Sequence, residues 1–333
     1  MPSAGRLERA AHAAGIETRR LDLGPPERRT AAAYAGAALA PFVLRGADAV
    51  LLNGLSTQRV VPALRLTRRR AGQARHPAVL RVDNPLLEPP RAWRRVGFWD
   101  RVGALIADSE HVARECAAAG APVERIVTAY PPAWSGDRPP GALGAARERG
   151  RRVGFVGTIE PRKGVLELIA AAEGFLAGRD SATLTLVGEA ADDDPDGYGE
   201  RVRAAARNSP VASRISFEGW RDDAAAAIAD FDLIVVPSLA EPFGTVAAEA
   251  AAAGVAVVAS EVGGLVEVVR DGESGLLVAP GDVLALARTI GALLDEPDRL
   301  RALGERALEL AERFSPRAYA DAVAAVLGRV RRP

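Results

Sequence analysis

The sequence has little of what defines several other classes of protein. Its single cysteine, Cys116, excludes an internal disulfide bond. No apolar run reaches the roughly 18 residues that a membrane-spanning helix needs, and no signal-peptide pattern opens the chain. With 48% hydrophobic and 26% charged residues, disorder is not expected either. We therefore expect a soluble, globular, cytoplasmic protein.

Motifs for common cofactors and metals are also missing. The chain has neither a glycine-rich dinucleotide fingerprint after a strand nor a phosphate loop ending in Gly-Lys-Ser/Thr. Its three histidines, His12, His76 and His111, are scattered. The acidic run over residues 192–196 lies in a polar stretch, and we interpret it as a solvated loop. The sequence predicts no metal, no cofactor and no nucleic-acid partner.

Lysine is nearly absent as well. Of the 43 basic residues, one is lysine, Lys163, so we expect it where arginine would not serve. Charge is unevenly divided, because residues 1–150 hold 23 basic and 14 acidic side chains, and residues 151–333 hold 20 and 29. The two halves therefore carry +9 and −9 by this count, which indicates two domains with different partners.

Length and pattern predict two α/β domains. A chain of 333 residues suits two cores, and in both halves short apolar stretches alternate with helical ones, as in parallel sheets with crossover helices. The expected strands are 49–52, 79–82, 104–107, 126–129, 153–156, 184–187, 215–217, 233–236, 255–259 and 276–278.

We predict two Rossmann-like, doubly wound parallel-sheet domains that face an interdomain cleft, where the carboxyl ends of such sheets bind ligands. The first would comprise residues 1–148, completed by a C-terminal helix over residues 316–333, and the second residues 149–315. Residues 5–15 look helical with no apolar strand before them, so we expect the first strand to be missing.

The strongest motif, residues 235–249, reads VVPSLAEPFGTVAAE. A strand leads through a Pro-Phe-Gly turn into a helix whose first amides form an anion site for a phosphate. Glu241 precedes this helix and Glu249 falls one turn after Thr245, so two carboxylates could accept hydrogen bonds from sugar hydroxyls on either side of the phosphate. A capped helix with acidic first turns would explain Glu249, but neither Glu241 nor the turn.

With two glutamates separated by seven residues around E-P-F-G, the sequence resembles the retaining glycosyltransferases of family 4, which have the GT-B fold. The resemblance is looser in the first half, where IADSE (106–110) and the prolines at 131 and 132 carry it. In the second half it rests on VGTIEPRKG (156–164), LVGE (186–189), FEGW (217–220), SEVGG (260–264) and DGESGLLV (271–278).

The resemblance implies a role for each residue of the main motif. Glu249 would hold the ribose hydroxyls of a nucleotide diphosphate sugar, and Glu241 would hold its hexose. Phe243, Gly244 and Thr245 would line the phosphates and the sugar.

The short loop that ends at Gly164 would supply the positive charge. The resemblance implies that Lys163, with Arg162 beside it, neutralises the leaving diphosphate. Thr158 follows Gly157 where the family commonly has a second phosphate arginine, and Arg162 is the candidate to replace it. An exposed loop residue is the alternative for Lys163.

Three residues are implied near the nucleotide base: Gly188, Glu189 and Trp220. An aromatic ring there could stack on the base, and the alternative for Trp220 is packing. These residues do not distinguish uridine from guanosine, although we favour a UDP-sugar over a GDP-sugar.

The acceptor side has weaker motifs. Asp83 and Asn84 follow an expected strand, with a turn or capping role as the alternative, and the histidine that many relatives place nearby is missing. Gly263 and Gly264 permit close approach of the backbone to the acceptor or donor sugar. The arginines at 65, 68, 69, 70 and 75 could attract an anionic acceptor or a membrane surface, but a solvated helix face is the favoured interpretation.

The resemblance implies a hexosyltransferase that retains the configuration of the sugar, and we expect it to be metal-independent. Its donor substrate would be a nucleotide diphosphate sugar, and its acceptor a small molecule, a glycan or a lipid-linked hydroxyl. A sugar-nucleotide epimerase of similar fold and a non-catalytic nucleotide-sugar-binding protein are the alternatives.

Overall fold

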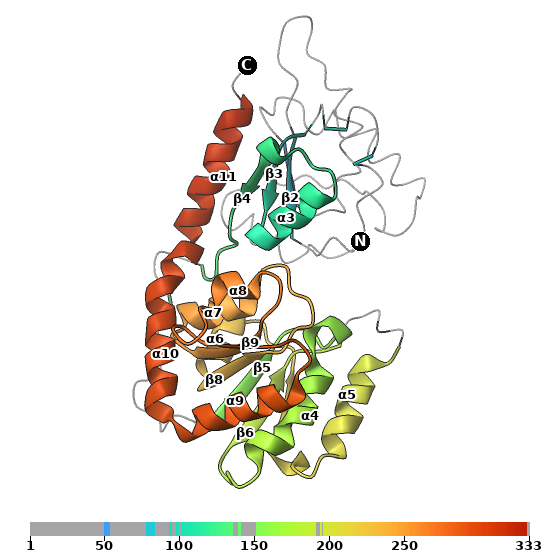
Figure 1. Ribbon diagram of the computed structural model, residues 1–333, viewed down its shortest axis with the longest axis vertical. Coiled ribbons are helices and arrows are strands. Elements are labelled where there is room, and N and C mark those ends of the chain that lie inside the picture. The colour runs from blue at the N-terminus through green and yellow to red at the C-terminus, as the bar shows by residue number, and fades with distance from the viewer. Residues whose placement is uncertain are drawn as a thin grey trace, which may run out of the picture.

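The computed structural model describes residues 50–53, 78–83, 93–94, 98–99, 102–135, 139–140, 151–190, 194 and 196–331. These residues form two parallel β-sheets with helices on their faces (Figure 1). Outside them lie the helical segment expected at residues 5–15, the arginines between 65 and 75, Asn84, and the boundary between residues 148 and 149, which stays a prediction.

The first sheet has the order β1-β2-β3-β4, and every neighbouring pair is parallel. Its strands are β1 (Val50–Asn53), β2 (Ala78–Val82), β3 (Val102–Ala107) and β4 (Ile126–Thr128). Helix α3 (Glu110–Ala118) packs on one face through Val112 and Cys116. Helix α11 (Pro316–Arg331) lies along the other face, where Val326 joins a cluster with residues of β2 and β3 (Figure 1).

The second sheet has the order β10-β9-β8-β5-β6-β7, again with parallel pairs. Its strands are β5 (Arg152–Val156), β6 (Thr183–Val187), β7 (Ile215–Gly219), β8 (Leu233–Val236), β9 (Ala256–Ser260) and β10 (Leu276–Val278). Each of the ten strands in the two sheets overlaps one expected from the sequence. The prediction of two parallel-sheet α/β domains is therefore confirmed.

Helices cover both faces of the second sheet. On one face α4, α5 and α9 share a core with Val153 and Phe155 of β5, and on the other α6 and α7 share a core with Ile234 and Val236 of β8. The helices are α4 (Val165–Leu176), α5 (Tyr198–Arg207), α6 (Ala224–Ala229), α7 (Thr245–Ala252), α8 (Leu265–Val268), α9 (Val283–Asp295) and α10 (Pro297–Leu310), with 3-10 turns η2 (Val123–Arg125), η3 (Pro161–Lys163), η4 (Ala212–Arg214) and η5 (Ala311–Phe314).

Local signals in the sequence set several helix ends. Asp282 caps α9 by accepting a hydrogen bond from the amide of Ala285, and Pro297 begins α10, where its missing N–H is not needed. After η5 the chain crosses back to the first sheet as α11 (Figure 1). Within the described residues, no helix has both the length and the apolar content to cross a membrane.

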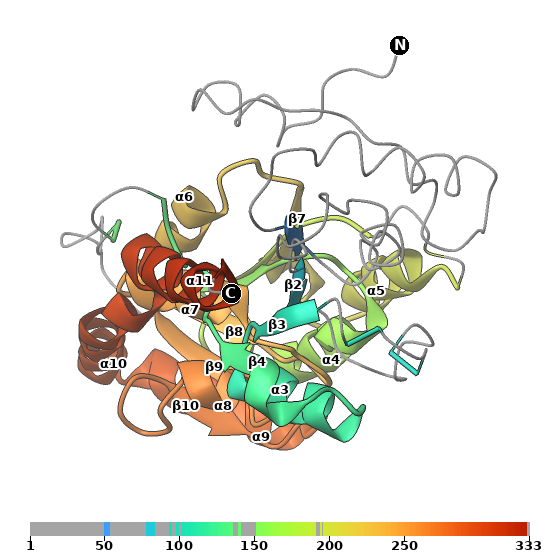
Figure 2. The same ribbon diagram turned by 90° about the horizontal axis from the view of Figure 1, so that it is seen from above.

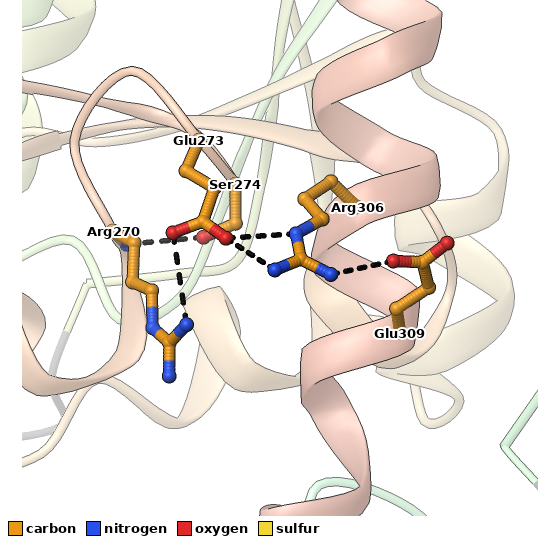
Figure 3. Close-up of polar contacts among 5 residues, drawn as sticks. All are labelled: Arg270, Glu273, Ser274, Arg306 and Glu309. Carbon is orange, nitrogen blue, oxygen red and sulfur yellow. Dashed lines mark hydrogen bonds and ion pairs between the residues drawn. The ribbon is translucent and has the colours of Figure 1, made fainter.

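The segment between α8 and β10 is held to α10 by an ion pair with hydrogen bonds (Figure 3). Arg306 of α10 donates from Nε to Glu273 at 2.8 Å and contacts the same carboxylate through a second nitrogen, and it also contacts Glu309 at 2.7 Å. The amide of Arg270 donates to Ser274 at 3.0 Å. These contacts fix the turn that leads into β10, and the hydrogen bond from Arg306 lowers the pKa of Glu273.

Candidate functional site

The carboxyl ends of β5 and β8 mark the point where the strand order of the second sheet reverses. β5 pairs with β6 on one side and with β8 on the other, so the loops after β5 and β8 diverge and leave room for a ligand between them. The loop after β5 carries Arg162 and Lys163, and the turn after β8 carries Glu241. The topology therefore brings together residues that are 78 positions apart in the chain.

Three side chains converge on the carboxylate of Glu241, which is only 8% exposed. Lys163 Nζ donates to Oε2 at 2.7 Å, and Ser238 Oγ donates to the same oxygen at 3.1 Å. A guanidinium nitrogen of Arg162 lies 3.9 Å from Oε1. A buried carboxylate needs such partners to remain charged. Ser238 was not predicted as a site residue from the sequence, although its position in the same turn as Glu241 indicated that it could contact that carboxylate.

Backbone contacts between the two loops hold Lys163 in place. The 3-10 turn that carries it ends at Gly164, which has a φ of 65°, and a Cβ there would lie 1.9 Å from the carbonyl oxygen of Pro237. The amide of Leu239 donates to the carbonyl of Arg162 at 2.7 Å. Only glycine fits this crossing, so Gly164 fixes the position of Lys163 beside Glu241.

Helix α7 begins directly after the turn, and no side chain caps its first amides, because Gly244 occupies the N-cap position with a φ of 103°. Such amides, at the positive end of the helix dipole, suit an anion. Thr245 is exposed at the first position, and Glu249 is half-buried one turn later. Burial raises the pKa of Glu249 to about 7.

The side chain of Phe243 lies in an aromatic cluster and is 3% exposed. Its ring centroid is 5.8 Å from that of Tyr130 and 5.5 Å from that of Phe314. Tyr130 follows β4 and Phe314 ends η5, so both crossings between the sheets meet at this ring. The ring is covered, and only the backbone of Phe243 could line phosphates or sugar.

Two glycines bring the ends of β5 and β6 close together. Gly157 and Gly188 have φ values of 147° and 139°, and a Cβ on Gly188 would lie 1.9 Å from the carbonyl oxygen of Gly157. The amide of Gly157 donates to the carbonyl of Val187 at 2.9 Å. Thr158 is half-buried next to them, and Glu189 is exposed. The backbone segments that follow β5 and β6 are therefore closely packed against each other.

Trp220 follows β7 and is 60% exposed. Its indole nitrogen donates to Asp222 at 2.9 Å, which fixes the ring at the surface. The alternative of a packed core tryptophan is wrong, because most of the side chain is open to solvent. Contact with a nucleotide base stays a prediction.

On the acceptor side, Asp83 follows β2 and lies 4.0 Å from Arg81. Arg81 donates two hydrogen bonds to Asp108, at 2.8 and 2.5 Å, yet burial raises the pKa of Asp108 to about 6. Sequence reasoning missed this pair, although an arginine inside an apolar strand was a signal. In the described part of the chain, no three or more His, Cys, Asp or Glu side chains are grouped to hold a metal ion.

Gly263 and Gly264 lie against the turn that holds Glu241. Gly263 has a φ of 57°, and a Cβ there would lie 1.9 Å from the carbonyl oxygen of Glu241. The amide of Gly264 donates to that oxygen at 2.9 Å. The expected close approach of backbone is present, but its partner is the protein's own turn.

Comparisons with known proteins show what this chain is similar to. The sequence model of the family "Glycosyl transferases group 1" matches residues 150–296. Over 283 residues the chain is 36% identical to D-inositol 3-phosphate glycosyltransferase 2 of Catenulispora acidiphila, an alignment that covers 78% of this chain and 63% of that protein. Over 230 residues it is 32% identical to 2-deoxystreptamine glucosyltransferase of Streptomyces kanamyceticus, covering 65% and 57%. The chain thus spans less than two thirds of the length of these relatives.

Among solved structures, the fold is similar to that of HepE from Anabaena in complex with UDP-glucose. The TM-score is 0.77 at 24% sequence identity, and the match covers 98% of this chain and 90% of HepE. At this identity the likeness establishes the fold, which is GT-B.

Proposed function

We propose that this chain, whose residues 150–296 match the family model of the group 1 glycosyltransferases, transfers a hexosyl unit from a nucleotide diphosphate sugar to an acceptor hydroxyl with retention of configuration. The observation that carries this proposal is the convergence of Lys163, Arg162 and Ser238 on the buried carboxylate of Glu241, beside the uncapped start of α7.

The proposed chemistry uses these groups on one leaving group. The amides of α7 and the ammonium of Lys163 would bind the diphosphate and stabilise the negative charge that grows on it as the bond to the sugar breaks. The sugar would acquire oxocarbenium character next to Glu241. The acceptor oxygen would bond to the anomeric carbon on the face from which the diphosphate leaves, and its proton would pass to a diphosphate oxygen on that face; attack from the same face gives retention.

We favour UDP as the nucleotide. HepE, whose fold is similar, has been crystallised with UDP and with UDP-glucose. Glu249 would accept hydrogen bonds from the ribose hydroxyls, and the exposed ring of Trp220 would stack on the base.

For the acceptor we favour a cyclic polyol. The relatives at 36% and 32% identity are named for D-inositol 3-phosphate and for 2-deoxystreptamine, and both of these molecules are rings that carry several hydroxyls. The excess of nine basic residues in residues 1–150 would favour a phosphorylated acceptor.

Binding is tested first, by thermal shift with UDP, GDP and their sugars. A nucleotide at 100 times its dissociation constant should stabilise the protein by about 2.7 kcal/mol. Release of UDP from UDP-glucose is then measured with D-inositol 3-phosphate, 2-deoxystreptamine or no acceptor. Lys163→Ala and Glu241→Gln should abolish acceptor-dependent release, whereas Glu305→Gln, an exposed change on α10, should not.

The outcomes separate the alternatives. UDP release that needs an acceptor and EDTA-resistant turnover support metal-independent transfer. Consumption of the UDP-sugar without acceptor and without UDP release would indicate an epimerase. Tight donor binding with no product from any acceptor would indicate a binding protein.

A further inference from the structure

The first turn of α3, on the first sheet, is held by residues that belong to the second. Ser109 Oγ, fully buried, accepts a hydrogen bond from the amide of Val112 at 3.1 Å and donates to the carbonyl oxygen of Pro242 at 2.5 Å. The carboxylate of Glu267 on α8 accepts hydrogen bonds from the amides of Glu110 at 2.8 Å and His111 at 2.7 Å. Both views of the ribbon place α3 next to α8 (Figure 1 and Figure 2).

This arrangement divides the cap of one helix between two domains. The first amides of a helix have no partners within it and are usually satisfied by a nearby side chain. Here Ser109 satisfies the amide of Val112, and the two amides before it depend on a carboxylate more than 150 residues later in the chain. Glu267 also accepts a hydrogen bond from Tyr130 at 3.1 Å. If the two sheets separate, these amides and the buried carbonyl of Pro242 lose their partners.

Through Ser109, the first-sheet domain also contacts the turn after β8, residues 237–244, which we call the donor turn. Pro242 directly follows Glu241, and the amide of Gly264, which precedes α8, donates to the carbonyl of Glu241 at 2.9 Å. Leu265 of α8 packs where a Cβ of Gly244 would lie, at 2.6 Å. The turn is therefore contacted both by α8 and by Ser109.

We propose that Glu267 is a positioning residue that holds the first-sheet domain closed over the donor turn, so that cleft closure and the placement of Glu241 are coupled. The inference rests on the proposed transfer function. Glu267 touches no substrate in this account, and it acts through α3 and the turn. Without it, the donor should still bind to the second domain, but transfer should slow because the cleft is closed for less of the time.

The chain offers a matched control. Asp194 accepts hydrogen bonds from the amides of Tyr198 and Gly199, both at 2.8 Å, at the start of α5. It is the same arrangement of one carboxylate and two helix amides, but it lies within one domain. Asp194→Asn therefore removes an equivalent cap without touching the contact between the sheets.

Hydrogen exchange tests the contact without any turnover. In Glu267→Gln, whose amide group cannot accept from both N–H groups, the amides of Glu110 and His111 should exchange about tenfold faster or more. In Asp194→Asn they should exchange as in the unchanged protein. Equal exchange in the unchanged protein and in Glu267→Gln would overturn the proposal.

Kinetics test the consequence. With UDP-glucose as donor, Glu267→Gln should lower kcat about tenfold and change the Kd for UDP less than about twofold, while Asp194→Asn changes neither. Ser109→Ala should lower kcat too. The kcat of the double variant should fall little further, because both changes disrupt the same contact between α3 and the second domain. A kcat within about twofold of the unchanged protein, or a parallel loss of UDP affinity, would overturn the proposal. Absence of UDP binding by the unchanged protein would contradict the proposed function instead, and exchange would still decide whether Glu267 holds α3.

Discussion

The ammonium nitrogen of Lys163 lies 2.7 Å from Oε2 of Glu241, and both side chains are largely buried, at 16% and 8% exposure. An ammonium group has three N–H donors, so Lys163 can keep this ion pair and still offer two hydrogens to a diphosphate. The only lysine of the chain is therefore paired with the turn that carries Glu241, and in the proposed function it would also bind the diphosphate.

Loss of Lys163 should lower stability as well as activity. Lys163→Ala leaves the charge of Glu241 buried with weaker partners, which should cost about 3 kcal/mol. In that background, Glu241→Gln should recover much of the loss, because it removes the unpaired charge. Urea unfolding measures both effects, with Arg301→Ala on α10 as an exposed control. If the second change added a further full loss, the ion pair would not be the cause.

The buried carboxyl of Glu249 should make nucleoside binding depend on pH. With a pKa of about 7, it is largely protonated at pH 6 and largely ionised at pH 8. Ribose hydroxyls donate to the ionised form, so binding lowers the pKa and releases a proton. The affinity for uridine, which has no phosphate to titrate, should rise up to about tenfold from pH 6 to pH 8. Calorimetry measures this rise, which Glu249→Gln should flatten; an unchanged slope in that variant would assign the effect to another group.

The stability of the fold should depend on pH in the opposite direction to uridine binding. The pKa of Glu249 is raised above its unfolded value, so the native state holds this proton more tightly and the ionised group costs stability. Relative to Glu249→Gln, the unchanged protein should lose stability as the pH rises from about 5 to 7, and the difference should level off above that. Thermal unfolding of the two proteins across this range checks it, and a difference that grows below pH 5 would contradict the sign.

Two glycines with the same backbone strain should differ in their importance. Gly263 and Gly272 have φ values of 57° and 72°, but a Cβ on Gly263 meets the carbonyl of Glu241 at 1.9 Å while nothing lies within 4 Å of one on Gly272. Gly272→Ala should cost about 1–2 kcal/mol from strain alone, with normal UDP binding. Gly263→Ala should cost more and should also weaken UDP binding, since the turn must shift. Equal effects in both variants would show that the contact with Glu241 carries no function.

The exposed ring of Trp220 should report on the base. Trp220→Ala should weaken UDP binding about tenfold if the ring stacks on uracil, and should leave the thermal stability nearly unchanged because the side chain is 60% exposed. Titration of the tryptophan fluorescence with UDP should show a change that the variant lacks. Equal UDP affinity in the two proteins would remove Trp220 from the site.

The sequence was sufficient for the strands and for the central pair of loops. Parallel strands are buried on both faces and therefore stand out as apolar runs, and the spacing of Glu241 and Glu249 survives as a local motif on one turn and one helix. The resemblance assigned Lys163 and Glu241 to the same ligand, and the strand order of the second sheet brings their two loops together.

Contacts made across long sequence separations could not be predicted in the same way. Nothing near Glu267 indicates that its carboxylate caps a helix of the other sheet, and nothing near Phe243 indicates that its ring is buried with Tyr130. The side chain of Arg81 donates to Asp108 only because β2 and β3 are neighbours in the sheet. Such pairings depend on how the elements pack, which local propensity does not encode.

The most direct test of the site compares UDP with uridine in calorimetric titrations of the unchanged protein and of Lys163→Ala. Because Lys163 contacts the diphosphate in the proposed site, the variant should bind UDP about 10–100-fold more weakly, as expected for lost hydrogen bonds to a charged group. Its affinity for uridine should stay within about twofold of that of the unchanged protein. An equal loss for both ligands, or no loss for UDP, would contradict the assignment of Lys163 to the diphosphate and with it the proposed donor site.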